Sequence, residues 1–108
     1  MDDATFRKRA DEALESLYQA LTRASEHYGF EPDFNAGALS IEFDDPPARF
    51  VVSPNSPVRQ IWVSANVRSF KLDFDSASNQ FILPATGQSL TALIAEQITH
   101  HLGGNVDL

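Results

Sequence analysis

The spacing of apolar residues changes twice along this chain, and this change constrains the fold more than any other feature. Apolar side chains recur every three or four positions in residues 4–28, alternate with polar ones in residues 34–82, and return to the longer spacing in residues 89–102. The longer spacing places side chains on one face of a helix, whereas alternation places them on one face of a strand. The predicted order is therefore helix, about five strands, helix.

The two periodic segments at the ends of the chain predict helices. The stripe of the first comprises Phe6, Ala10, Leu14, Leu17, Leu21, Ala24 and Tyr28. Asp2 or Asp3 can cap its N-terminus, where negative charge favours the helix dipole, and Gly29 is expected to end it. The second helix is expected between Ser89, a candidate N-cap, and the stop at Gly103.

The middle of the chain predicts strands joined by short turns. Its alternating segments are residues 39–43, 50–52, 60–65, 70–74 and 80–83. Turns are expected at residues 44–47, 54–57 and 76–79. Short connections favour antiparallel pairing, so we predict an α+β fold. It is a two-layer sandwich of five or six antiparallel strands with both helices on one sheet face, formed by residues 1–108 as one domain.

Charge is distributed unevenly. The 108-residue chain has a net charge of −7, and residues 1–45 hold eleven acidic and four basic residues, which accounts for all of it. Phosphate repels such a chain, so no nucleic-acid partner is expected. Without cysteine it forms no disulfide and no thiolate metal site. It has no apolar run of about 18 residues and no apolar leader, so we expect a cytoplasmic protein without a membrane role.

The acidic side chains of the first part of the chain are one candidate site. Asp11 and Glu15 are four residues apart on one face of the predicted helix, with Glu12 at its edge, and Glu31 and Asp33 precede the first predicted strand. Carboxylate oxygens suit iron, manganese, magnesium or calcium. We expect the acids to form one surface, on which any metal site is shallow and weak.

The same residues have a simpler explanation. The outer face of a helix is normally charged and solvated. Arg7 and Lys8 also lie four residues before Asp11 and Glu12, a spacing that allows ion pairs. The residues alone favour this explanation over a metal site.

The sheet face turned away from the helices is a second candidate site. If Ile61 faces the helices, its neighbours Gln60 and Trp62 face away from them. An exposed tryptophan among polar side chains is a common anchor for a protein partner, and Lys71 or Arg49 could lie over its ring. Packing against neighbouring side chains on a flat sheet is the alternative role for Trp62.

Signatures of an enzyme are missing. The sequence has no Gly-rich phosphate loop, no HExxH motif and no nucleophile elbow, and we expect no catalytic residue. Glu96 and His100 are four residues apart and could supply two metal ligands, although an ordinary polar helix face explains them as well.

Residues 56–64, Ser-Pro-Val-Arg-Gln-Ile-Trp-Val-Ser, resemble the signature of the frataxin family. In that signature a proline and two further residues precede Gln-Ile-Trp, which is followed by a hydrophobic and a small residue. Residues 10–17 are similar to the acidic first helix of frataxins, residues 35–41 to their first strand, and residues 87–94 to the start of their last helix. The resemblance covers nearly the whole chain, which looks like the bacterial, CyaY-like members.

The resemblance implies the frataxin sandwich fold and a role in iron–sulfur cluster assembly. Frataxins bind ferrous and ferric iron weakly at surface carboxylates, dock on a cysteine desulfurase and its scaffold partner, and modulate sulfur transfer. By resemblance, iron is expected at Asp11, Glu12, Glu15, Glu26, Glu31 and Asp33. Partner binding is expected at Asn55, Gln60, Trp62 and Lys71. A monomer is expected in the absence of iron.

Two departures from the family pattern leave alternatives open. Gln19, Thr22 and Arg23 stand where frataxins usually have acids, and Pro54 stands where they commonly have a basic residue. One alternative is a ferroxidase-type activity or iron storage. The other is an interaction module whose iron binding is incidental.

Overall fold

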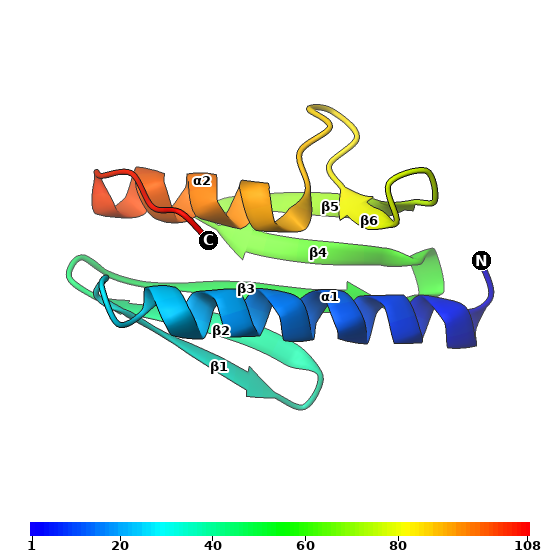
Figure 1. Cartoon of the computed structure of the whole chain (residues 1–108), viewed down its shortest axis with the longest axis horizontal. Coiled ribbons are helices and arrows are strands. Elements are labelled where there is room, and N and C mark those ends of the chain that lie inside the picture. The colour runs from blue at the N-terminus through cyan, green and yellow to red at the C-terminus, as the bar shows by residue number, and fades with distance from the viewer.

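Six strands pair in chain order to form one antiparallel sheet, and both helices lie on one of its faces (Figure 1). The structure is a computed structural model that describes residues 1–108. Its elements are α1 (Asp3–Ala24), β1 (Phe30–Asn35), β2 (Ala38–Asp44), β3 (Pro47–Asn55), the 3-10 helix η1 (Ser56–Val58), β4 (Gln60–Ala65), β5 (Arg68–Asp75), β6 (Gln80–Ile82) and α2 (Leu90–Leu102). This architecture confirms the predicted two-layer α+β sandwich.

The N-terminal caps of both helices match the sequence prediction. The carboxylate of Asp2 accepts a hydrogen bond from the Thr5 N–H at 2.8 Å, and the hydroxyl of Ser89 accepts one from the Ala92 N–H at 3.2 Å. Each bond satisfies one of the amide groups that the first turn of a helix leaves free.

Neither helix combines the length and apolarity that a membrane span requires.

Helix α1 is shorter than predicted. It ends at Ala24, with Ser25 as its C-cap, so the predicted end at Gly29 is wrong. Tyr28 lies beyond the helix and stacks on Phe30, with 6.3 Å between ring centroids. The apolar spacing continued past Ala24 because Tyr28 still packs against the core from the turn that follows.

Strand β1 is not among the alternating segments identified in the sequence, and it is the sixth strand of the five or six predicted. Strand β1 pairs with β2 across a turn at Ala36 and Gly37, whose φ angles are 55° and 80°. Pro32 and the acidic Glu31 and Asp33 disguise the strand, because proline and acids are depleted in sheets. Since β1 is an edge strand, Pro32 is tolerated there despite its missing N–H.

Strand β3 also extends further than predicted. Pro54 and Asn55, expected in a turn, pair with Ile61 and Gln60 of β4. The chain then reverses through η1 and Arg59, whose φ of 56° lies in the left-handed region. The extension brings Asn55 onto the same strand ladder as Gln60.

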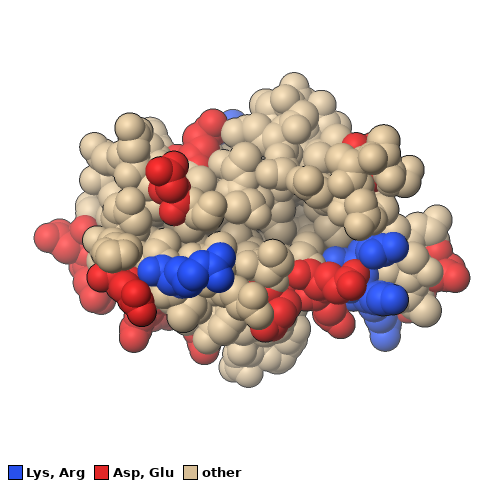
Figure 2. All heavy atoms as spheres, viewed as in Figure 1, with Lys and Arg blue, Asp and Glu red and all other residues tan.

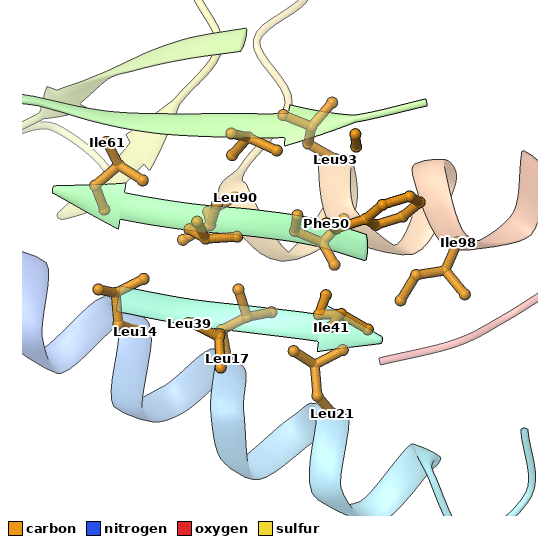
Figure 3. Packing of buried hydrophobic residues seen from close by; sticks show 14 of the residues in the cluster. Leu14, Leu17, Leu21, Leu39, Ile41, Phe50, Ile61, Leu90, Leu93 and Ile98 are labelled. Atoms are coloured by element: carbon orange, nitrogen blue, oxygen red, sulfur yellow. The ribbon is translucent and has the colours of Figure 1, made fainter. Parts of the chain in front are cut away.

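The core lies between the helices and one face of the sheet. Leu17 and Leu21 of α1, Ile41 of β2, Phe50 of β3 and Ile98 of α2 are completely or almost completely buried, and their side chains converge (Figure 3). Burying one such side chain contributes roughly 1.5–3 kcal/mol. Since alternate strand residues point into this core, the residues between them form an outer sheet face that no helix covers.

The turn between β4 and β5 is strained. Asn66 and Val67 have φ angles of 51° and 58°, the left-handed region that β-branched side chains rarely adopt. The Asn66 amide donates to the backbone and side-chain oxygens of Gln97 at 3.1 and 3.0 Å, which fixes the turn to α2. The side chain of Val67 is fully exposed and gains nothing from packing.

The substitution Val67→Gly is expected to raise the free energy of unfolding by about 0.5–1 kcal/mol. Glycine adopts the left-handed conformation without a Cβ clash, and Asn-Gly is the favoured pair in such turns. Urea denaturation followed by circular dichroism measures the change. Ser69→Gly, in the adjoining strand, is the control and is expected to lower stability. If Val67→Gly unfolds at a lower urea concentration than the native chain, the claim that the turn is strained at Val67 is wrong.

Candidate functional site

The four residues expected to bind a partner lie together on the outer sheet face. Asn55 of β3 lies opposite Gln60 of β4, and Gln60 lies opposite Asp73 of β5. Two residues further along β4, Trp62 lies opposite Lys71 of β5. The alternation of β3, β4 and β5 therefore gathers residues from three strands into one surface.

The indole of Trp62 is held by its neighbours. Its Nε1–H donates to Gln60 Oε1 at 2.9 Å, and the Gln60 Nε2–H donates to Asp73 Oδ1 at 3.0 Å. The ammonium of Lys71 lies 5.0 Å from the centroid of the indole ring, within reach of a cation–π interaction. Trp62 nevertheless keeps 38% of its surface exposed. The ring is thus ordered and available for contact.

Of the two basic residues considered for the Trp62 ring, the structure places Lys71 there and not Arg49. Arg49 lies opposite Glu42 in the β2–β3 ladder, with 3.9 Å between its Nε and Glu42 Oε1. This pair is exposed on both sides, so its contribution to stability is small.

A shallow groove of about 220 Å³ lies beside Trp62 on the same face. It is lined by Val51, Ser53, Trp62, Val63, Ser64, Ser69, Phe70 and Lys71. Serines at three of these positions leave space next to the large indole ring. A hydrophobic ring beside a depression with a polar rim suits recognition of a protein surface.

Asp73 is the member of this face whose contact the sequence did not reveal. Alternation places it on the outer face, but its hydrogen bond to Gln60 depends on the register between β4 and β5. Only the pairing of β4 with β5 shows that Asp73 accepts a hydrogen bond from Gln60, the residue that accepts one from Trp62.

The six carboxylates expected to bind iron are all exposed but occupy three separate segments. Asp11, Glu12 and Glu15 lie on α1, Glu26 in the turn after it, and Glu31 and Asp33 on β1. No three histidine, aspartate or glutamate side chains form a group that could hold a metal ion. The structure does not assemble these residues into one coordination site.

The acids of α1 and β1 do not form the single surface that the sequence suggested. In β1, Phe30 is buried toward the core, so the alternating Glu31 and Asp33 turn to the outer sheet face. There Glu31 lies opposite Glu42, which in turn lies opposite Arg49. The helix acids instead belong to the layer on the other side of the sheet.

Basic residues interrupt the acidic face of α1. Arg7 Nε lies 3.0 Å from Asp3 Oδ2, and Arg9 Nη1 lies 3.4 Å from Glu12 Oε1. The ion pairs that the spacing allowed, of Arg7 with Asp11 and of Lys8 with Glu12, are not formed, since Arg7 pairs with Asp3 and Glu12 with Arg9. Helical side chains lean toward the N-terminus, which explains why Arg7 reaches back to Asp3. Figure 2 shows acidic and basic atoms interspersed on this side of the molecule.

Two carboxylates have perturbed pKa values, and both cap local turns. Hydrogen bonds from Thr5 lower the pKa of Asp2, and hydrogen bonds from Ser78 lower the pKa of Asp75. Because each bond favours the ionised form, these shifts reflect capping of a helix and of a turn and not a reactive centre.

Comparison with known proteins gives a consistent result. The family model described as a frataxin-like domain matches residues 1–104. The iron–sulfur cluster assembly protein CyaY of Azotobacter vinelandii is 29% identical over 101 residues, which cover 92% of this chain and 91% of that protein. The protein of the same name from Thioalkalivibrio sulfidiphilus is 24% identical over 108 residues and is matched along its full length.

A solved structure shares the fold. The frataxin of Psychromonas ingrahamii, described as a member of the CyaY protein family, matches with a TM-score of 0.78 at 21% sequence identity. The match covers 99% of this chain and 97% of that one.

Because Trp62 lies outside the core, Trp62→Ala is expected to change the free energy of unfolding by less than about 1 kcal/mol. The matched control is Ile61→Ala, next to it in β4 and fully buried, which is expected to lose about 2–5 kcal/mol. Urea unfolding of both variants measures the difference. A loss for Trp62→Ala as large as for Ile61→Ala would show that the tryptophan serves the fold and not a partner.

Proposed function

The chain belongs to the frataxin-like family, and on this premise we propose that it acts in iron–sulfur cluster assembly by docking its outer sheet face on the assembly machinery. The proposed partners are a cysteine desulfurase and its scaffold, in the bacterial cytoplasm. Names given to similar proteins support this role, since relatives matched over more than 90% of the chain are called iron–sulfur cluster assembly proteins.

The ordered, exposed Trp62 is the observation that carries the proposal. Trp62 lies on a sheet face that no helix covers, and burying such a ring in a complex is a frequent source of binding energy. Its neighbours Asn55, Gln60 and Lys71 supply hydrogen-bond donors and one positive charge around it. Together they offer an apolar anchor with a polar rim.

The exposed acids support a second contact and a weak affinity for iron. Carboxylates on α1 suit a basic patch on the desulfurase, an association that salt would weaken. Iron would bind as cargo at one or two carboxylates at a time, since no group of three ligands is assembled. Such binding exchanges quickly, as transfer of iron to a scaffold requires.

Trp62→Ala is expected to weaken binding to the desulfurase–scaffold complex at least tenfold, because the anchor of the interface is lost. Isothermal titration calorimetry measures the dissociation constant. Val58→Ala is the matched control, since Val58 is also apolar and 51% exposed but lies in η1 and not on the outer sheet face. Equal affinities for Trp62→Ala and the native chain would refute the proposed docking face.

Anaerobic addition of ferrous iron is expected to broaden the amide resonances of residues 11–15 and 26–33 first, because high-spin iron relaxes nuclei near the carboxylates that hold it. Heteronuclear NMR spectra at increasing iron concentration measure the effect. Magnesium at equal concentration controls for ionic strength. If these resonances neither broaden nor shift, iron does not bind at the proposed carboxylates, and the interaction role stands without it.

A further inference from the structure

We propose that Asp73 is a positioning residue, which fixes the orientation of the Trp62 indole through the side chain of Gln60. The inference rests on the proposed docking role of Trp62 and adds how this anchor is prepared before a partner arrives. Three side chains from two paired strands form the chain Trp62, Gln60, Asp73, with bonds of 2.9 and 3.0 Å.

The direction of the two hydrogen bonds allows only one arrangement of the Gln60 amide. The indole Nε1–H can only donate, and an ionised carboxylate can only accept. With Gln60 Oε1 toward Trp62 and Nε2 toward Asp73, both contacts are satisfied. If the amide were reversed, two donors would face each other at one end and two acceptors at the other. Asp73 therefore determines the Gln60 orientation, and Gln60 the indole orientation.

Strand β5 supports the ring twice. Asp73 and Lys71 are two residues apart on β5 and point to the same sheet face, where they flank the Gln60–Trp62 pair of β4. The Lys71 ammonium lies 5.0 Å from the indole centroid. Rotation of the ring away from this position would break its hydrogen bond and move it off the ammonium at the same time.

The two hydrogen bonds of Gln60 give it a role other than direct contact with a partner. Its oxygen is engaged by Trp62 and its nitrogen by Asp73, so the side chain connects two residues of this protein. A side chain that is already ordered loses less conformational freedom on binding, which tightens association. We infer that Gln60 and Asp73 act on affinity through Trp62.

The experiment compares Asp73→Ala with Asp73→Asn in the full chain. Alanine removes the acceptor, whereas asparagine keeps an oxygen for Gln60 and removes only the charge. Asp73 lies on the exposed sheet face, so both variants are expected to fold. Glu42→Gln, on the same face but outside the hydrogen-bonded chain, controls for loss of a negative charge.

Two readouts are measured for each variant. The first is the NMR resonance of the Trp62 indole N–H in the free protein, together with its exchange with water. The second is the dissociation constant for the desulfurase–scaffold complex. For Asp73→Ala we expect a shifted, faster-exchanging indole resonance and about three- to tenfold weaker binding. For Asp73→Asn and Glu42→Gln we expect an indole resonance and an affinity close to those of the native chain.

Each other outcome contradicts a specific claim. An unchanged indole resonance in Asp73→Ala overturns the positioning role, and so does an Asp73→Asn variant that behaves like Asp73→Ala. If Trp62→Ala weakens binding but Asp73→Ala moves the indole without any change in affinity, the positioning role is overturned as well. Failure of the docking proposal is distinguishable, because Trp62→Ala would then bind normally while the indole of Asp73→Ala still shifts.

Discussion

Packing of α1 against the inner face of the sheet is the interaction on which the other features depend. The leucines of α1 meet branched and aromatic side chains of the strands, and α2 closes the same layer. Because both helices are used on one side, the hydrophobic effect sorts every strand residue onto a covered or an uncovered face. The proposed docking surface is the uncovered face, and its composition follows from that sorting.

On the outer sheet face, the side chain of Trp62 is both held in one orientation and exposed, two properties that seldom occur together. A side chain without a core around it normally samples several rotamers, yet Trp62 is held by one hydrogen bond and by the Lys71 ammonium. Strand pairing makes this possible, since residues directly opposite one another in a ladder have their Cβ atoms within about 5.5 Å. The sheet is thus a frame on which neighbouring side chains orient Trp62, and the shallow groove next to the ring remains open.

The acidic residues have a different character. They are exposed and divided between the helix layer and the outer sheet face, and partly paired with arginines. Such an arrangement suits long-range attraction and brief contacts with cations more than tight coordination, because a metal held by few carboxylates competes poorly with water. The two surfaces therefore differ in physical terms: one offers shape and an anchor, and the other offers charge. Glu31 and Asp33 lie on the edge strand β1 and face the same side of the sheet as Trp62.

The sequence by itself determined the layers of this protein, because helix and strand periodicities are local properties of hydrophobic spacing. It predicted the order of elements, an N-cap at Asp2 or Asp3 and another at Ser89, and the outward direction of Trp62. It missed β1, whose proline and acids suit an edge strand, and it assigned to one surface acids that lie on α1 and on the outer sheet face. Only the tertiary structure decided which side chains meet across strands. The hydrogen bond of Gln60 to Asp73 and the position of Lys71 beside Trp62 depend on the β4–β5 register, which joins residues that local spacing does not connect.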